Sequence, residues 1–176
     1  AQRCTYNMYG KLLAGRKYHS KRNHIARFKD NPGWFYEKIT KDNVEECVRM
    51  NHIWKKKRVD KWDDMMQEEY DVVKEALMCF EELGLTGGLL RKDGEVIAFT
   101  LGEPLSDDTF VVHFEKAFPE IQGAYTMINQ QFVLAECQNY KYINREEDTG
   151  DEGLRKAKLS YHPVILLSKY TACQRG

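Results

Sequence analysis

The sequence lacks several features that would each point to a particular class of protein. Its 27 Lys and Arg balance 27 Asp and Glu, so the chain as a whole has no net field with which to attract a polyanion. No apolar run approaches the roughly 20 residues that cross a bilayer, and no secretory signal pattern opens the chain. The five cysteines include no C-x-x-C pair, which argues against both a zinc site and a disulfide framework. We therefore expect a cytoplasmic protein whose membrane contact, if any, is peripheral.

What the chain does contain is enough apolar material for one substantial core. Its 176 residues are 42 % hydrophobic, which suits one globular domain and is too little for two ordinary ones. We expect residues 34–176 to form this domain and residues 1–33 to form a basic helical connector. The connector helix is predicted at 16–29, because apolar residues recur there at helical spacing before the Asn31-Pro32-Gly33 stop.

The predicted connector helix is strongly basic, with six Lys and Arg and two His between Arg16 and Lys29. One hypothesis is that this helix, together with the basic run Lys55 to Arg58, binds the phosphates of tRNA or an anionic lipid surface. The alternative is a solvated face, or a helix that packs on the acidic segment 68–82.

Beyond Gly33, residue patterns predict a strand, two helices, three strands, a helix, a strand, a short helix and a closing strand. The two successive helices begin near 44 and 66, and the apolar seam of the second continues to Leu83. Asp93-Gly94 joins two apolar runs and is typical of a type I′ turn in a β-hairpin. This order predicts an α+β domain with a mixed, mostly antiparallel sheet flanked by helices.

Four separated stretches carry a resemblance to a known family. They are GRKYHSKRNHIARF, GGLLRKDGEVIAFTLGE, HFEKAFPEIQGAYTMINQQF and NREEDTGDEGLRKAKLSYHP. Together they resemble the family of phosphatidylglycerol lysyltransferase C-terminal domains, a FemABX-like branch of the GNAT acyltransferases, over almost the whole chain. The resemblance implies a GNAT-like acyltransferase fold and transfer of an aminoacyl group from aminoacyl-tRNA to an amine or hydroxyl. It also implies a partner, an N-terminal GNAT-like lobe that this chain lacks.

Two other functions remain open beside aminoacyl transfer. One is a non-catalytic GNAT-like lobe that binds or regulates a partner; the other is an acyl-CoA-dependent N-acetyltransferase. GNAT enzymes of the latter kind hold the CoA pyrophosphate at a helix N-terminus under an Arg/Gln-x-x-Gly-x-Gly/Ala signature. Only Gln122-Gly123-Ala124 matches that signature here, and Glu120 adds an unfavourable charge. Gln122 and Gly123 are therefore candidate substrate-binding residues, but acyl-CoA is a weaker donor candidate than aminoacyl-tRNA. No metal is required.

His113 and Glu115 are the first catalytic candidates. They are two positions apart near the end of a predicted strand, so regular alternation places them on one face, where they could supply a general base. The alternative is a structural histidine bonded to a neighbouring carboxylate.

The segment 144–163 supplies the other candidates. Asp151 is a suitable N-cap, and acids early with bases late along the following helix suit the helix macrodipole. Capping does not explain the acids ahead of Asp151. We therefore expect these acids to line a cleft where the sheet splays, with Asp148 in a catalytic role. Residues of the following helix would position an acidic or carbonyl group of the substrate. The alternative is a structural ion-pair network. The candidate residues of this segment are Arg145, Glu147, Asp148, Lys156, Lys158 and Tyr161.

Overall fold

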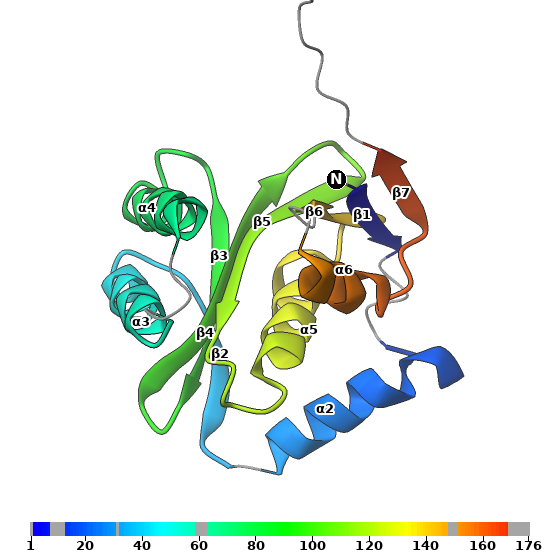
Figure 1. The fold of residues 1–176 in the computed structure, drawn as a ribbon, viewed down its shortest axis with the longest axis horizontal. Coiled ribbons are helices and arrows are strands. Elements are labelled where there is room, and N and C mark those ends of the chain that lie inside the picture. The colour runs from blue at the N-terminus through cyan, green and yellow to red at the C-terminus, as the bar shows by residue number, and fades with distance from the viewer. Residues whose placement is uncertain (1, 8–12, 31, 59–62, 148–150, 169–176) are drawn as a thin grey trace, which may run out of the picture.

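The computed structural model describes residues 2–7, 13–30, 32–58, 63–147 and 151–168 (Figure 1). The strands are β1 (Gln2–Asn7), β2 (Trp34–Lys38), β3 (Thr86–Lys92), β4 (Glu95–Pro104), β5 (Thr109–Ala117), β6 (Tyr142–Glu147) and β7 (Ile165–Ser168). The helices are the 3-10 turn η1 (Arg16–Tyr18), α2 (His19–Lys29), α3 (Val44–Lys56), α4 (Asp64–Met78), α5 (Ala124–Glu136) and α6 (Glu152–Leu159).

The strands form one sheet in the order β2-β3-β4-β5-β6-β1-β7. Neighbouring strands are antiparallel except β5 and β6, which are parallel. The predicted α+β class and mixed, mostly antiparallel sheet are thus confirmed. The sequence did not predict β1, which lies between β6 and β7, so residues 2–7 of the expected connector belong to the sheet.

Two turns around the central hairpin show how local sequence sets the chain path. Asp93 and Gly94 adopt positive φ angles of 51° and 86°, which confirms the predicted type I′ turn. The helix that was expected to continue to Leu83 instead ends at Met78. The chain then turns through Gly84 at φ 67°, and the Leu85 amide donates to the Phe80 carbonyl at 2.7 Å.

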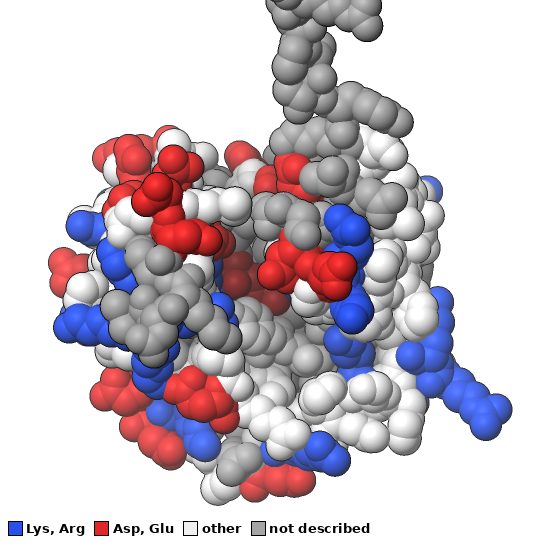
Figure 2. All heavy atoms as spheres, in the orientation of Figure 1, with Lys and Arg blue, Asp and Glu red and all other residues white. Residues whose placement is uncertain are grey.

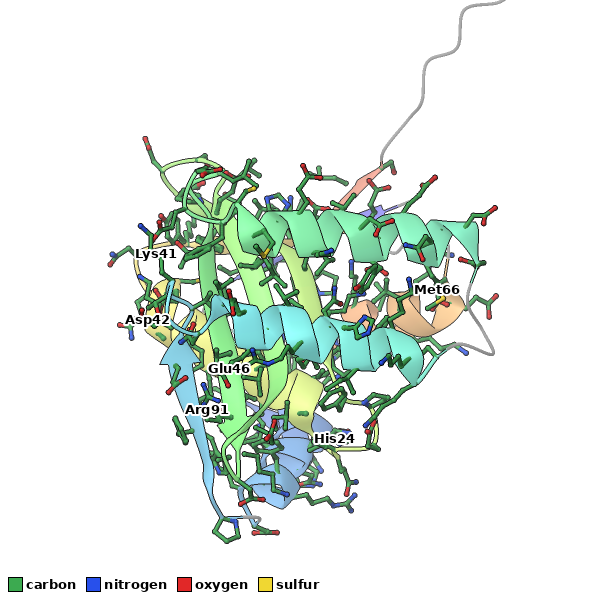
Figure 3. All side chains as sticks on the ribbon, turned by 90° about the vertical axis from the view of Figure 1, so that its left-hand side faces the viewer. His24, Lys41, Asp42, Glu46, Met66 and Arg91 are labelled. Atoms are coloured by element: carbon green, nitrogen blue, oxygen red, sulfur yellow. The ribbon has the colours of Figure 1, made fainter. Side chains whose placement is uncertain are left out.

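Helices cover both faces of the sheet, with α3 and α4 on one side and α5, α6 and α2 on the other (Figure 1). The core between these layers includes fully buried Leu89, Leu90 and Phe99 of the central hairpin. Arg91 ties α3 to the sheet by donating to both carboxylate oxygens of Glu46, at 2.6 and 3.0 Å, and to Glu37 at 3.0 Å (Figure 3). Among the described residues, no helix is long and apolar enough to cross a membrane.

The basic helix α2 packs into this core. Tyr18, Ile25 and Phe28 are buried in the same cluster as the sheet. At the start of α5, a Cβ on Gly123 would lie 2.4 Å from the His24 carbonyl oxygen, so the two backbones are in close contact. The alternative in which this helix packs on the acidic segment 68–82 is therefore wrong, because α4 lies on the opposite side of the sheet (Figure 1).

Candidate active site

The two parallel strands β5 and β6 part from each other halfway along their length. They pair only from Thr109 with Tyr142 to Val111 with Asn144. Beyond these residues β5 continues beside β4, and β6 continues beside β1 as far as Glu147. On the side facing the opening, β5 beyond Val111 has no strand partner within the described part of the chain. The sheet therefore splays at the place where the sequence led us to expect the cleft.

A β-bulge lies on each side of this splay. On β5, pairing shifts from Leu101 with Phe114 to Gly102 with Val112, so His113 is an extra residue. On β6 the register with β1 also shifts, and Glu146 has a positive φ of 53°. Bulges change the direction in which a side chain points, and they are common beside active sites.

The bulge on β5 overturns the prediction that His113 and Glu115 share one face of the strand. Regular alternation is interrupted at His113, whose ring lies 6.1 Å from the ring of its neighbour Phe114. Glu115 instead accepts a hydrogen bond from Asn129 of α5, on the other face, at 3.0 Å. The two catalytic candidates therefore contact different residues and do not form a pair.

His113 bridges three strands. Its Nδ1 lies 2.8 Å from a carboxylate oxygen of Glu146 on β6, and its Nε2 lies 2.8 Å from one of Glu103 on β4. Only the doubly protonated ring can donate to both carboxylates at once. The hydrogen bond to Glu146 is the largest cause of the raised His113 pKa. Burial lowers this pKa, and the hydrogen bond to Glu103 raises it. To act as a base, His113 would first have to release one of these contacts.

We expect this bridge to make stability depend on pH. Because the folded pKa of His113 is raised above its unfolded value of about 6.5, the stabilisation is complete below about pH 6.5 and is lost as pH rises through the folded pKa. Replacing His113→Gln should reduce the free energy of unfolding more at pH 6 than at pH 9. The difference between the two losses should be less than about 1 kcal/mol, because the groups are partly exposed. Urea denaturation at both pH values measures the effect. The control is His52→Gln. The His52 ring is exposed, and its described polar contact is the Tyr70 hydroxyl. A loss for His113→Gln that is equal at both pH values would contradict the charged bridge.

At the opening of the splay, Glu115 and Arg145 form a largely buried ion pair. Arg145 Nη2 donates to Glu115 Oε1 at 2.8 Å, and the two side chains are only 14 % and 10 % exposed. The other carboxylate oxygen of Glu115 accepts from Asn129. The Arg145 guanidinium lies 5.1 Å from the ring centroid of Tyr161, which follows α6. The ion pair thus joins β5, β6, α5 and the turn after α6.

Lys158 has a structural position in the same region. Its side chain on α6 is buried, and its ammonium donates to the carbonyls of Arg145, at 2.6 Å, and Glu147. These carbonyls lie on the part of β6 that no longer pairs with β5. Lys158 therefore supplies hydrogen bonds that the splay removes from the sheet, and this explains why a lysine is buried here.

Tyr161 is the centre of a cluster that also includes the connector helix. Its carbonyl accepts from the Tyr18 hydroxyl at 3.2 Å, and the Lys21 ammonium lies 4.1 Å from its ring centroid. Burial raises the pKa of the Tyr161 hydroxyl. Burial also lowers the pKa of Lys21, and the neighbouring Arg145 charge lowers it further. The helix α2 is therefore part of the site wall.

The remaining candidates lie around this centre or away from it. Glu147 ends β6, Lys156 is exposed on α6, and Asp148 lies outside the described residues. Gln122 is exposed beside the start of α5, where Gly123 has a φ of 85° and contacts the His24 carbonyl of α2. The helix terminus that binds pyrophosphate in CoA-dependent GNAT enzymes thus lies against another helix here.

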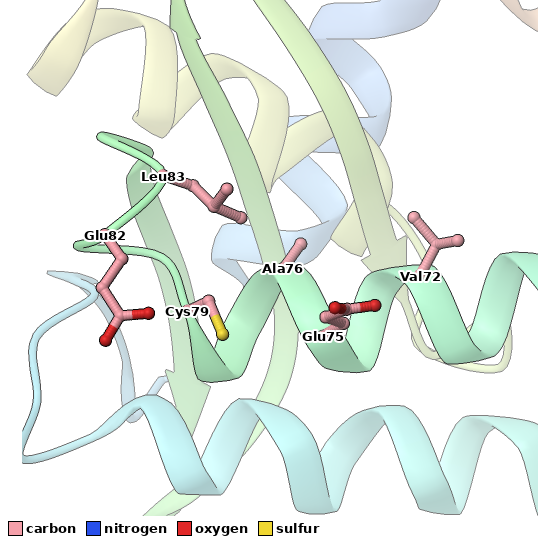
Figure 4. A pocket seen from close by; sticks show the side chains of 6 residues that line it. All are labelled: Val72, Glu75, Ala76, Cys79, Glu82 and Leu83. Carbon is pink, nitrogen blue, oxygen red and sulfur yellow. The ribbon is translucent and has the colours of Figure 1, made fainter.

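The space-filling view shows a hollow between the layer of α3 and α4 and the side formed by α6 (Figure 2). Acidic side chains lie within it, and lysines and arginines follow one of its walls. A separate depression on α4 is lined by Val72, Glu75, Ala76, Cys79, Glu82 and Leu83 (Figure 4). None of the predicted site residues lines it, so it is not part of the candidate active site.

The sequence analysis missed three residues of the site. Glu103 and Asn129 carry no local signal, since strand register and helix docking bring them to His113 and Glu115. Lys21 did carry one. It lies three positions after Tyr18 and four before Ile25, within the apolar stripe of α2, so it faces inward with them.

Comparison with solved structures identifies the class of fold. A tandem GNAT protein from the clavulanic acid biosynthesis pathway superposes with a TM-score of 0.50 at 6 % identity, covering 91 % of this chain and 48 % of that chain. Such a likeness shows the fold alone. Together with the splayed mixed sheet, it shows a GNAT-like fold.

The family is shown by sequence. The family model described as phosphatidylglycerol lysyltransferase, C-terminal, matches residues 11–173, and this chain belongs to that family. A conserved protein of unknown function from Bacteroides thetaiotaomicron VPI-5482 is 45 % identical, with a TM-score of 0.86 over 94 % of this chain. L-PGS from Bacillus licheniformis is 17 % identical, with a TM-score of 0.60 over 93 % of this chain. In both cases the chain spans 56 % of the other protein's length. No curated protein matches the chain.

Proposed function

We propose that this domain is an aminoacyltransferase of the GNAT and FemABX type. It moves an activated aminoacyl group from aminoacyl-tRNA to an amine or hydroxyl acceptor in the cytoplasm, at or near the membrane surface. Family membership supports this proposal, because the family is described as a phosphatidylglycerol lysyltransferase and its acceptor would thus be a lipid hydroxyl. The chain spans about half of its solved relatives, so a further lobe is a proposed partner in the reaction.

One observation carries the proposal, namely the splay of β5 and β6 with the Glu115 and Arg145 ion pair at its opening. Transfer needs a place where an ester carbonyl and an acceptor oxygen can meet, with fixed hydrogen-bond donors around the developing charge. The proposed donors beside the splay are the Arg145 guanidinium and the main-chain N-H groups of β5 beyond Val111, where the described residues provide no strand partner.

The proposed reaction is direct transfer. The acceptor oxygen or nitrogen forms a bond to the ester carbonyl carbon, and the bond from that carbon to the 3′ oxygen of the donor breaks. The acceptor loses a proton, and the departing 3′ hydroxyl gains one. Positive charge and main-chain N-H groups stabilise the tetrahedral oxyanion between these steps.

Glu115 and His113 serve in this proposal as positioning residues. Both carboxylate oxygens of Glu115 accept hydrogen bonds, from Arg145 and Asn129, and both ring nitrogens of His113 face carboxylates. On the side of the splay formed by β6 and α6, the proposed substrate contacts are Glu147, Lys156 and Tyr161. Asp148 stays a proposed catalytic residue, and exposed Arg16 and Lys17 of η1, just before α2, would meet phosphates of the donor tRNA.

The acyl-CoA alternative has less support, because α2 lies against the start of α5 at Gly123.

A transfer experiment distinguishes the proposed enzyme from the alternative of a non-catalytic lobe. We expect radiolabelled lysine to pass from lysyl-tRNA to phosphatidylglycerol vesicles in the presence of the chain, and acetyl-CoA to give no acetylated product. Arg145→Lys keeps the charge but alters the forked geometry, so it should lower transfer at least tenfold while leaving the circular dichroism spectrum unchanged. Transfer at the background rate by the wild-type chain, supplemented with the part of its Bacteroides relative that this chain does not cover, would favour the non-catalytic lobe.

A further inference from the structure

The helix α4 carries a second apolar stripe besides the one that packs into the domain core. The core side of this helix includes Val73 and Leu77, which are fully buried. The second stripe consists of Met65, Val72 and Cys79, which are seven residues apart. A spacing of seven residues returns to nearly the same side of an α-helix. Met65 and Val72 are 64 % and 52 % exposed, so this side of α4 remains open to solvent in the folded domain.

The second stripe continues past the end of α4 into the depression shown in Figure 4. The chain keeps a helical turn there, because the Leu83 amide donates to the Cys79 carbonyl at 2.9 Å. Leu83 is 54 % exposed and lines the depression together with Val72, Ala76 and Cys79. The sequence pattern predicted Leu83 in the core seam of this helix, but the residue instead belongs to an exposed groove, which we call the α4 groove.

A line of acids follows the stripe with the same spacing. Glu68, Glu75 and Glu82 are seven residues apart and exposed, and the last two line the α4 groove. Among the described residues no ion pair involves these three acids, whereas the neighbouring Glu69 pairs with Lys116 at 2.8 Å. Acidic side chains gather over the position of α4 in the space-filling view (Figure 2). The α4 groove therefore combines an apolar floor with an acidic rim.

The two lines of side chains define the chemistry of an occupant. Apolar residues at seven-residue spacing are the contact pattern of one helix against another, and acids beside such a seam pair with Lys or Arg of the partner helix. Amphipathic helices bind apolar grooves of this kind through their apolar face. Nucleic acids and anionic lipid surfaces are repelled by the same acids. The chain's own basic helix α2 lies on the opposite side of the sheet, so it does not occupy the groove (Figure 1).

We propose that the α4 groove binds a basic, amphipathic α-helix of a partner protein. Apolar residues of that helix contact Val72 and Leu83, and its Lys or Arg side chains pair with Glu68 and Glu75. None of the candidate active-site residues lines the groove, so this inference does not depend on the proposed transfer activity.

A designed peptide provides the probe for a binding experiment. It has three heptads, with Leu at the first and fourth positions, Lys at the fifth and seventh, and Ala or Gln elsewhere. In a matched peptide Glu replaces every Lys. We expect the chain to bind the Lys peptide in fluorescence anisotropy, with an affinity that falls at least tenfold between about 50 and 300 mM salt. The Glu peptide should bind at least tenfold more weakly at the lower salt concentration.

Two variants separate the floor of the groove from its rim. Val72→Ser should weaken binding of the Lys peptide at least fivefold at both salt concentrations, because it removes apolar area from the contact. Glu75→Gln should weaken it at least threefold at low salt and less at high salt, because it removes one charge that salt screens. Glu95→Gln changes an exposed acid of β4 outside the groove and should leave binding unchanged within error. The replaced side chains are exposed, so the circular dichroism spectra should stay the same.

Several results would overturn the proposal. Equal binding of the Lys and Glu peptides would show that the acids do not select the occupant. Unchanged affinity of Val72→Ser for the Lys peptide would show that the apolar floor is not the contact. Analytical ultracentrifugation of the chain alone tests a different occupant. A dimer that Val72→Ser converts to monomer would assign the groove to a second copy of this chain and overturn the partner-protein assignment.

Discussion

Replacing Arg145→Met is expected to lower the free energy of unfolding by about 3 kcal/mol. The arginine and its partner Glu115 are both largely buried, so removing one leaves an uncompensated charge between β5 and α5. Loss of the guanidinium also removes its contact with the Tyr161 ring. Denaturation in urea, followed by circular dichroism, measures the change.

A double-mutant cycle identifies the cause of this loss. Glu115→Gln keeps an acceptor for Asn129 and removes the charge, so the double variant Arg145→Met with Glu115→Gln should be more stable than the sum of the single losses predicts. Lys41→Met, which removes one partner of an exposed ion pair with Glu81, should leave stability unchanged within error. Additive losses from the two site variants would show that the pair is not coupled in solution.

Replacing Gly123→Ala is expected to destabilise the protein by more than 2 kcal/mol. About 1 kcal/mol follows from a positive φ of 85° that alanine adopts unfavourably. The rest follows from the new Cβ, which would lie 2.4 Å from the His24 carbonyl oxygen and would push α2 away from α5. Because α2 carries Lys21, amide hydrogen exchange of α2 should accelerate in this variant.

Gly84→Ala is the matched control for this prediction. Gly84 also has a positive φ, of 67°, but nothing lies within 4 Å of the position that its Cβ would take. This variant should therefore lose only the conformational contribution of about 1 kcal/mol, with exchange of α2 unchanged. Equal losses for the two glycine variants would show that α2 does not pack closely on α5.

The elements that local patterns specify were predictable from the sequence. The Asp93-Gly94 turn and the Asp151 cap follow from residue chemistry that acts over a few positions, and both are present. The strand β1 was not predicted, since its six residues become a strand only by pairing with β6 and β7, which lie more than 130 positions further along the chain. Such pairing has no local signature.

The site was predictable as a region but not as a geometry. The segment after Asn144 was correctly expected at a splay of the sheet, and Arg145 and Tyr161 lie there together. A bulge depends on the register between two strands, so the sequence could not show that His113 and Glu115 would point apart. The buried position of Lys158 likewise depends on the carbonyls that the splay leaves without partners.

A crystal structure of the chain with a stable donor analogue, in which an amide replaces the lysyl ester of 3′-lysyl-adenosine, tests the central claim most directly. The account predicts that the amide carbonyl lies between β5 and β6, within hydrogen-bond distance of Arg145 or of the main-chain N-H groups of β5 beyond Val111. Binding of the analogue elsewhere, with the splay closed by its own side chains, would contradict it.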